Sequence, residues 1–413
     1  MFQVITKEII MLVVQKYGGS SVADPERIHR VAGRIAAVQE EGHDIVAVVS
    51  AMGDATDELI SLVNKITDTP SDREMDMLLS TGEQVSIALL AMAIKERGRP
   101  VISLTGSQAG IITDGVHTKA RILNINTGRL KTELSRGKIV VVAGFQGVEK
   151  AGNNTTTLGR GGSETTAVAL AVALGADLCE IYTDVDGVYT TDPRIVPEAR
   201  KLETISYEEM LELANLGAGV LHPRAVEMAM NYKMTLHVRS SFNTNSGTLV
   251  KEVENMEKAL YVTGVVCDHD VAKIGLFNVI DKPGIAFRIF KALAEEKINV
   301  DMIIQSAMRD GRNDISFTCS QGDLKKALAV VDGLQAVIGA DGYTHSDGVA
   351  KVSIVGAGMI SNPGVAAQMF ESLYGEGINL EMISTSEIRI SCVIRDKDAE
   401  NAVKALHKEF NLA

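Results

Sequence analysis

A turn near the start of the chain carries side chains suited to bind phosphate. Lys16 ends an apolar run and is followed by Gly18, Gly19 and Ser20, and the next helix is predicted to begin near Pro25. Glycines let the backbone approach a ligand, a helix N-terminus offers N–H groups, and a lysine adds positive charge. The turn therefore predicts a phosphate site, although an ordinary strand-to-helix turn has the same pattern. Neither standard nucleotide fingerprint, GxxxxGK[ST] or GxGxxG after a strand, occurs in the sequence.

A second glycine-rich turn surrounds a single arginine. Arg160 lies between Gly159, Gly161 and Gly162, directly before the helical pattern of residues 164–176. The guanidinium group is shaped to bind a carboxylate with two parallel hydrogen bonds. This arrangement favours a carboxylate-binding loop over a surface hairpin, because such a hairpin rarely begins so apolar a helix.

Two further segments carry hydroxyl and acidic groups. Residues 50–57 end another apolar run and include Ser50 and Thr56. Gly82 lies in a helical pattern, where glycine costs about 1 kcal/mol relative to alanine, so close packing or a ligand is expected there. Its neighbour Glu83 is then a candidate ligand group, although a lone glutamate on a helix is more often solvated.

The densest polar stretch covers residues 182–194. It resembles a calcium loop only loosely, because the downstream glutamate is missing and Val188 and Tyr189 interrupt the oxygen ligands. Tyr189 could instead cover a purine, and Arg194 could reach a phosphate. No HxxxH or Ser-His-Asp pattern supports a hydrolase.

These candidates must be positioned by alternating strands and helices. Short runs rich in Val and Ile, apolar on both faces, are typical of parallel sheets covered by helices. The alternation predicts a three-layer α/β sandwich with a mainly parallel sheet over residues 11–250. The predicted strands are 11–15, 44–50, 100–104, 138–145 and 179–185, and the predicted helices are 25–42, 74–98 and 164–176.

The C-terminal part contains an internal repeat. Residues 281–306 match residues 361–386 at an offset of 80 (361 − 281), and strands and a helix flank both copies in the order βαββαβ. The repeat predicts two ferredoxin-like domains at 264–342 and 349–413, with 256–263 as a strand that the second could borrow.

Composition excludes several classes of protein. The chain has 413 residues, enough for two or three domains, and its net charge of −12 argues against nucleic acid or an anionic membrane as main partner. No apolar run reaches the roughly 18 residues of a membrane span, and the first residues are predicted to be a short leader. The four cysteines lack CxxC spacing, which predicts core thiols in a reducing cytoplasm.

Taken together, these motifs resemble the aspartate kinase family. The resemblance covers about 11–413, and the number and order of the motifs make it specific. The motifs are KYGGSSV (16–22), SAMGDATDEL (50–59), STGEQ (80–84), AGFQG (143–147), TTLGRGGSETTAVALA (156–171), YTDVDGVYTTDPR (182–194), HPRAVE (222–227) and the two repeats.

The resemblance implies an amino-acid-kinase catalytic domain followed by two ACT domains. The implied reaction converts ATP and L-aspartate to ADP and 4-phospho-L-aspartate, the first step towards lysine, threonine and methionine. Mg²⁺ would arrive with ATP, and no protein metal site is implied. A side-chain carboxylate with a pKa of about 3.9 is already ionised at pH 7, so no general base is needed.

By the same resemblance, the site residues fall into four groups. Lys16 and Glu164 would be catalytic. The nucleotide would bind Lys16, Gly18, Gly19, Ser20, Thr183, Asp184, Tyr189 and Arg194. Ser50 and Thr56 would hold the reacting carboxylate of aspartate, Glu83 its ammonium group, and Arg160 with Ser163 its α-carboxylate. Lysine and/or threonine would inhibit the enzyme by binding near Asp281, Gly284, Ala286, Gln305, Asn379 and Thr385.

Two positions depart from the family pattern. Glu164 stands where aspartate is usual, and Gly219 stands where lysine is usual. Both positions help to orient the catalytic lysine and bind phosphates in the family, so slower chemistry is one expectation. The other is that Glu164 reaches the same atoms in a different rotamer and that Lys233 or Arg224 supplies the missing cation.

The paired ACT units also bear on the assembly of the chain and on its alternative functions. The paired ACT units predict a homo-oligomer, and a separately translated regulatory half could start near Met256. A glutamate 5-kinase or a carbamate-kinase-like enzyme would lack the paired units. A catalytically weakened amino-acid sensor of the same fold is the remaining alternative.

Overall fold

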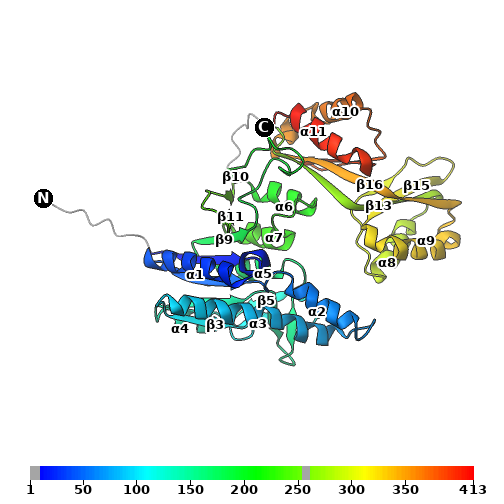
Figure 1. Ribbon diagram of the computed structural model, residues 1–413. Coiled ribbons are helices and arrows are strands. Elements are labelled where there is room, and N and C mark those ends of the chain that lie inside the picture. Colours follow the sequence, from blue (N-terminus) through cyan, green and yellow to red (C-terminus); the bar gives the residue numbers. More distant parts are fainter. Residues whose placement is uncertain (1–9, 254–260) are drawn as a thin grey trace. The chain divides into compact units, whose positions relative to one another are not determined.

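The computed structural model describes residues 10–253 and 261–413, which form two compact units (Figure 1). The first unit contains most of the chain up to residue 253. The second contains Tyr189–Arg200, Leu216–Ala218 and the chain from residue 261 onward. The expected leader and the expected start at Met256 lie outside the described residues.

An eight-stranded sheet forms the middle layer of the first unit. Its order is β10-β12-β11-β9-β1-β2-β6-β3, and its neighbours are parallel except for β11 and β12. Runs of Val and Ile fill the central strands, which are buried on both faces as expected for a covered parallel sheet. The strands are β1 (Leu12–Tyr17), β2 (Asp44–Val49), β3 (Val101–Leu104), β6 (Ile139–Ala143), β9 (Leu178–Thr183), β10 (Thr204–Ile205), β11 (Leu236–Ser240) and β12 (Thr248–Val250).

Helices cover both faces of this sheet (Figure 1). Helices α1 (Pro25–Glu40) and α3 (Asp72–Glu96) share one apolar cluster with the sheet, whereas α5 (Gly162–Leu174) contacts β1, β2 and β9 outside that cluster. The predicted three-layer sandwich is therefore confirmed. The remaining helices of this unit are α2 (Ala55–Asn64), α4 (Gly128–Leu134), α6 (Tyr207–Asn215) and α7 (Pro223–Tyr232).

A small second sheet in the first unit was not predicted. Its order is β5-β4-β7-β8, and β8 leads directly into the turn that carries Arg160. Strands of three or four residues are too short to show a period of two in the sequence. They are β4 (Ile111–Thr113), β5 (Ile122–Ile125), β7 (Gln146–Glu149) and β8 (Thr155–Thr157).

The second unit is built on a six-stranded antiparallel sheet of order β14-β15-β13-β16-β18-β17. Each half of the sheet carries two helices, so the paired ferredoxin-like architecture is confirmed. The strands are β13 (Gly264–Ile280), β14 (Ile303–Gln305), β15 (Arg312–Cys319), β16 (Gly342–Val355), β17 (Met382–Thr385) and β18 (Arg389–Arg395). The helices are α8 (Ile285–Glu295), α9 (Leu324–Ile338), α10 (Val365–Gly375) and α11 (Ala399–Glu409).

The two halves share their long central strands. Residues 264–268 of β13 pair with the C-terminal part of β16, and Val265 packs in the core of the second half. The second half therefore takes a strand from 264–268, and the expected borrowed strand at 256–263 stays a prediction. Part of that expected segment, 256–260, lies outside the described residues. Ion pairs between described residues join the halves, among them Lys273 with Glu381 and Lys351 with Asp301.

Two features bear on expectations about the membrane and the thiols. By length and composition alone α3 could cross a membrane, although charged and polar residues interrupt its apolar sequence. Half of its most apolar 18-residue window is buried inside the unit, as in the core helix of a globular domain. The cysteines are free thiols; three are buried, and burial raises the pKa of Cys267 and of Cys392 to about 12.

Candidate active site

The carboxyl ends of four parallel strands bring the candidate residues to one edge of the sheet. Tyr17 pairs with Val49 of β2 and with Tyr182 of β9. Because the three strands end in register, the residues that follow them lie side by side at the edge of the sheet. The Gly18 N–H donates to the Tyr182 carbonyl at 3.3 Å, and the Gly144 N–H donates to the Val49 carbonyl at 3.0 Å. Ligand sites in open α/β sheets lie at such an edge.

Lys16 is held at this edge by an ion pair. Its side chain is largely buried, and its Nζ lies 3.1 Å from Oε1 of Glu164 at the start of α5. The other oxygen, Oε2, accepts a hydrogen bond of 2.7 Å from the backbone N–H of His222. Glu164 therefore uses both oxygens to connect Lys16 with the turn that begins α7. A Cβ on Gly18 would lie 3.3 Å from Nζ, so the glycine keeps space beside the ammonium group open.

The two residues expected to replace the cation missing at Gly219 both have partners within the protein. Arg224 donates to the carbonyls of Leu158 at 2.6 Å and Ala120 at 3.0 Å. Lys233 ends α7 and pairs with Glu252 at 2.9 Å. In this structure both side chains are engaged with these partners, so the expectation that a basic residue such as Arg224 or Lys233 fills the gap stays a prediction.

The turn after β1 packs tightly against the turn after β2. The Gly53 N–H donates to the Gly19 carbonyl at 3.1 Å, and a Cβ on Gly19 would lie 2.9 Å from the Ala51 carbonyl oxygen. Arg27 of α1 donates to the Ser20 carbonyl at 2.6 Å. Both turns thus line one side of the candidate site. Ser50 belongs to the second turn, and Thr56 lies in the first turn of α2, which follows it.

Glu83 is a buried acid with an unused oxygen. A Cβ on Gly82 would lie 2.8 Å from the Ala51 Cβ, which confirms the close packing inferred from this glycine. Oε1 of Glu83 accepts from the Ala51 N–H at 3.2 Å, whereas Oε2 has no partner among the described residues. The residue is only 3% exposed, and burial raises the pKa of its carboxyl to about 7. A cationic ligand at Oε2 would supply the missing partner.

Arg160 and Ser163 stand on either side of the start of α5. Arg160 is exposed, and no described residue forms a hydrogen bond or ion pair with its guanidinium group. Ser163 is buried, and a Cβ on Gly144 would lie 2.6 Å from its Oγ. Gly161 adopts the left-handed φ of 69°, and a Cβ there would lie 2.1 Å from the His222 ring. Glycine at 161 therefore allows this turn to close on the α7 turn.

The expected nucleotide residues divide between the two units. Thr183 ends β9, and its hydroxyl donates to Asp184 at 3.0 Å. Tyr189 and Arg194 belong to the second unit, where Tyr189 packs against an apolar core and Arg194 pairs with Asp192. That guanidinium lowers the pKa of the Asp192 carboxyl. The structure thus places Thr183 and Asp184 at the sheet edge, and the nucleotide-binding roles of all four residues stay predictions.

The expected effector residues lie at the two ends of the six-stranded sheet. Its edge strands are β14 and β17. Asn379 and Thr385 lie at the β17 end, and Gly284 with a φ of 92° begins α8 in the other half. The β14 half carries Asp281, Gly284, Ala286 and Gln305.

Sequence reasoning missed two groups around the site. Asp76 is fully buried on α3, seven residues before Glu83, and that spacing on one helix face was the available signal. Behind the Lys16 turn, the rings of Tyr17 and Tyr182 stack at 4.8 Å, with Arg34 4.6 Å from the second ring. No spacing in the sequence relates these three residues.

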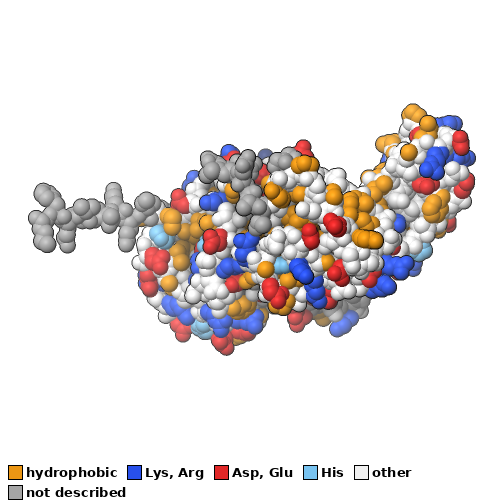
Figure 2. Space-filling model, turned by 90° about the horizontal axis from the view of Figure 1, so that it is seen from above, with side chains coloured by type: hydrophobic (Ala, Val, Ile, Leu, Met, Phe, Trp, Pro, Cys, Tyr) orange, Lys and Arg blue, Asp and Glu red, His pale blue; other side chains and the backbone are white. Residues whose placement is uncertain are grey.

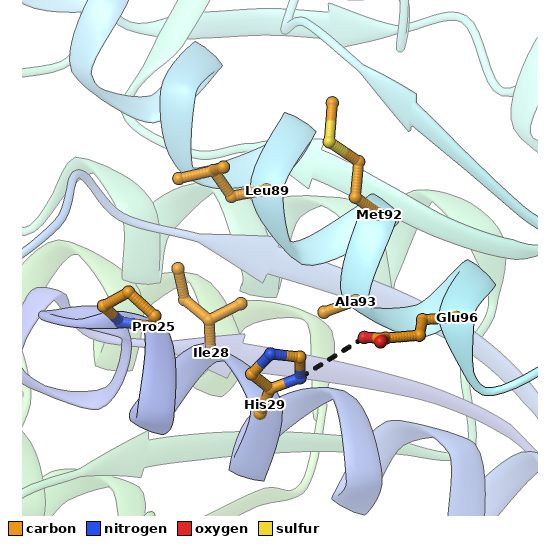
Figure 3. A pocket seen from close by; sticks show the side chains of 7 residues that line it. All are labelled: Pro25, Ile28, His29, Leu89, Met92, Ala93 and Glu96. Atoms are coloured by element: carbon orange, nitrogen blue, oxygen red, sulfur yellow. Dashed lines mark ion pairs between the residues drawn. The ribbon is translucent and has the colours of Figure 1, made fainter.

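A separate pocket lies between α1 and α3 (Figure 3). It has a volume of about 350 Å³ and is lined by Pro25, Ile28, His29, Leu89, Met92, Ala93 and Glu96. Its lining contains none of the candidate site residues, and its polar contact is His29 with Glu96 at 3.8 Å.

On the molecular face in Figure 2, basic and acidic side chains are interspersed.

Comparison with known proteins matches both parts of the chain. The amino acid kinase family matches residues 11–240, and the ACT domain matches residues 278–333 and 352–410. The aspartokinase of Geobacillus stearothermophilus is 56% identical over 402 residues, which cover 97% of this chain and 98% of the relative. That of Mycolicibacterium smegmatis is 52% identical over 406 residues, 97% of this chain and 96% of the relative.

Solved structures agree with these matches. The chain resembles E. coli aspartokinase III in complex with aspartate and ADP, with a TM-score of 0.81 and 25% identity over 97% of this chain and all (100%) of that one. It also resembles the same E. coli protein in complex with lysine and aspartate, with a TM-score of 0.75 and 26% identity, over 97% and 99% of the two chains.

The close approach of Gly161 to His222 can be tested with a matched pair of variants. Gly161 and Gly175 flank the same helix with nearly equal left-handed φ angles, 69° and 67°, but a Cβ on Gly175 meets no atom within 4 Å. Gly175→Ala should cost only the backbone strain of about 1–2 kcal/mol. Gly161→Ala should cost at least about 2 kcal/mol more, because the new methyl group displaces His222. Chemical denaturation measures both, and equal losses would contradict the packing described.

Proposed function

The chain belongs to the aspartokinase branch of the amino acid kinase family, and from this premise we propose that it transfers the γ-phosphoryl group of ATP to the side-chain carboxylate of L-aspartate. The products are ADP and 4-phospho-L-aspartate. The aspartate and ADP bound to the E. coli relative support this choice of substrates.

The observation that carries the proposal is the buried, unpartnered Oε2 of Glu83. An amino-acid substrate brings an ammonium group, which would satisfy this oxygen and hold Glu83 ionised. Arg160, whose guanidinium has no described partner, would bind the α-carboxylate together with Ser163 at the start of α5. These groups fix the backbone of the amino acid and leave its side chain for Ser50 and Thr56 to orient.

The proposed chemistry consists of positioning and charge neutralisation. The attacking carboxylate is already ionised, so no side chain has to remove a proton. Lys16, oriented by Glu164, would neutralise charge on the transferring phosphoryl group. Gly18 would leave space for the nucleotide beside Nζ, and Gly19 and Ser20 would offer backbone N–H groups. Mg²⁺ bound to the ATP phosphates would share this neutralisation. Among the described residues no group of three or more acidic, His or Cys side chains could hold a metal ion by itself.

Thr183 and Asp184 would contact the nucleotide beside the Lys16 turn, with Tyr189 and Arg194 as further proposed contacts. Because Gly219 replaces the usual lysine, the site has one cation fewer for the phosphates than the family pattern. For this reason a catalytically weakened amino-acid sensor is the second candidate function. The ion pair between Lys16 and Glu164 favours the enzyme, because it keeps the ammonium group oriented despite the longer acid.

We also propose feedback control through the ACT pair, at the start of lysine, threonine and methionine synthesis. Lysine in one E. coli complex makes it a candidate inhibitor, with threonine as the other. Since β14 and β17 are opposite edges of one sheet, a site that uses Gln305 and Thr385 together requires a second copy of the chain. A homo-oligomer that pairs these edges would supply it. A separately translated regulatory half from near Met256 remains a prediction.

The first test measures ADP formation that depends on L-aspartate, as a function of pH. Because the pKa of Glu83 lies near 7, kcat/KM for aspartate should rise as pH increases through 7 and then level off. Below that pH the neutral acid no longer attracts the ammonium group. Glu83→Gln should raise the KM for aspartate about ten- to a hundredfold and remove this dependence, since a charge-assisted bond is lost.

The ATP phosphates also titrate near pH 6, but they affect parent and variant alike, so the difference between the two profiles isolates Glu83. No aspartate-dependent ADP formation by the parent would refute the proposed reaction and favour the sensor. A parent profile equal to that of Glu83→Gln would refute the role of Glu83.

The shared effector site is tested by mixing variants. Gln305→Ala and Thr385→Ala should each weaken inhibition by lysine or threonine while leaving KM for aspartate unchanged. In a two-fold assembly of one chain of each kind, one site loses both residues and the other keeps both. Co-refolded mixtures should therefore regain part of the inhibition that each pure variant lacks. Failure to regain it would show that the two residues do not share a site between chains.

A further inference from the structure

We propose that Asp76 is a positioning residue for substrate binding, a buried carboxylate that fixes the loop carrying Arg160. The inference rests on the proposed function, because its readout is the affinity for aspartate. Asp76 itself lies in α3 and is completely buried, so it acts on the substrate through the groups that it holds.

Asp76 gathers donors from two segments far away in the chain. Its Oδ1 accepts from the Thr157 hydroxyl at 2.5 Å, and both of its oxygens accept from the Thr118 N–H at 3.1 and 3.2 Å. Nδ1 of His117 lies 2.6 Å from Oδ2. A buried carboxylate is stable only with such partners, so these bonds restrain the two segments strongly.

The two segments are also bonded to one another. The Ala120 N–H donates to the Thr157 carbonyl at 2.9 Å, and Arg224 joins the carbonyls of Ala120 and Leu158. Gly159, with a φ of 76°, lies so close that a Cβ there would be 3.0 Å from the Thr118 carbonyl oxygen. Thr157 is therefore the last anchored side chain of β8 before the glycine turn, three residues before Arg160.

The same helix carries the other group for the amino acid. Asp76 and Glu83 are seven residues, or about two helical turns, apart on one face of α3. Through Asp76, the Arg160 loop is tied to the helix that presents Glu83. This clamp, formed by Asp76 with His117, Thr118 and Thr157, thus sets the separation between the groups proposed for the α-carboxylate and the ammonium of aspartate. The hydrogen bonds of Asp76 given above join it to none of the residues of the Lys16 turn.

A pair of Thr157 variants tests the clamp. Thr157→Val removes the hydroxyl at nearly constant volume, and Thr157→Ser keeps it. With Thr157→Val, KM for aspartate should rise about tenfold, while KM for ATP changes less than about twofold. Thr157→Ser should stay near the parent. A purely structural role would lower the melting temperature without this split between the two substrates.

His117→Ala provides a second variant that removes a donor at the partly exposed end of the clamp, and His117→Asn places an amide nitrogen near the position of Nδ1. His117→Ala should raise KM for aspartate in the same direction, and His117→Asn should restore it. These substitutions keep the inference testable even if Thr157→Val folds poorly.

Combination with Arg160→Ala shows whether the clamp acts through that loop. If it does, Thr157→Val added to Arg160→Ala should raise KM for aspartate by much less than it does in the parent. Full additivity, or equal changes in both KM values for Thr157→Val, would overturn the inference. An inactive parent would instead refute the proposed function, so the two failures are distinguishable.

Discussion

A lysine buried at the end of a parallel strand needs a negative partner, and this requirement organises the site. Lys16 finds the partner in Glu164, 148 residues away in sequence, and Glu164 places its second oxygen on the His222 N–H. Three segments are joined by one carboxylate: the end of β1, the start of α5 and the start of α7. The closeness of Gly161 to His222 follows from the same junction, because the turns can meet only if one of them lacks a side chain.

At the position proposed for the ammonium group of aspartate, one oxygen of a buried carboxylate lacks a partner in the described part of the chain. Glu83 is as buried as Lys16, and this burial raises the pKa of its carboxyl. Only one of its oxygens has a partner among the described residues. The fold thus pairs the ammonium group of Lys16, which must stay fixed, but leaves one oxygen of Glu83 for a ligand to bind. Such incomplete satisfaction costs stability and is typical of functional sites.

Much of this arrangement could be predicted from residues that are locally unfavourable. Gly82 inside a helix pointed to Glu83, and an arginine among glycines pointed to the start of α5. Long Val- and Ile-rich strands were clear for the same reason, because burial on both faces leaves a continuous apolar run. Short strands such as β4 and β8 carry too few residues for a pattern.

Features that depend on contacts between distant residues were not accessible from the sequence. Nothing near Asp76 indicates that Thr118 and Thr157 will reach it. The strand at 264–268 is apolar whichever half it completes. Arg224 and Lys233 have the correct charge to replace the lysine absent at Gly219, and only the structure shows that carbonyls and Glu252 occupy them.

The central claim, that Glu164 orients Lys16 while bonded to His222, is tested most directly by kcat at saturating ATP and aspartate. Glu164→Gln removes the charge at constant length and should lower kcat at least about tenfold with little change in KM for aspartate. Glu164→Asp restores the acid usual in the family, but it should be no faster than the parent, because the shorter side chain cannot reach both Nζ and the His222 N–H. A Glu164→Gln enzyme as fast as the parent, or a faster Glu164→Asp enzyme, would contradict the account.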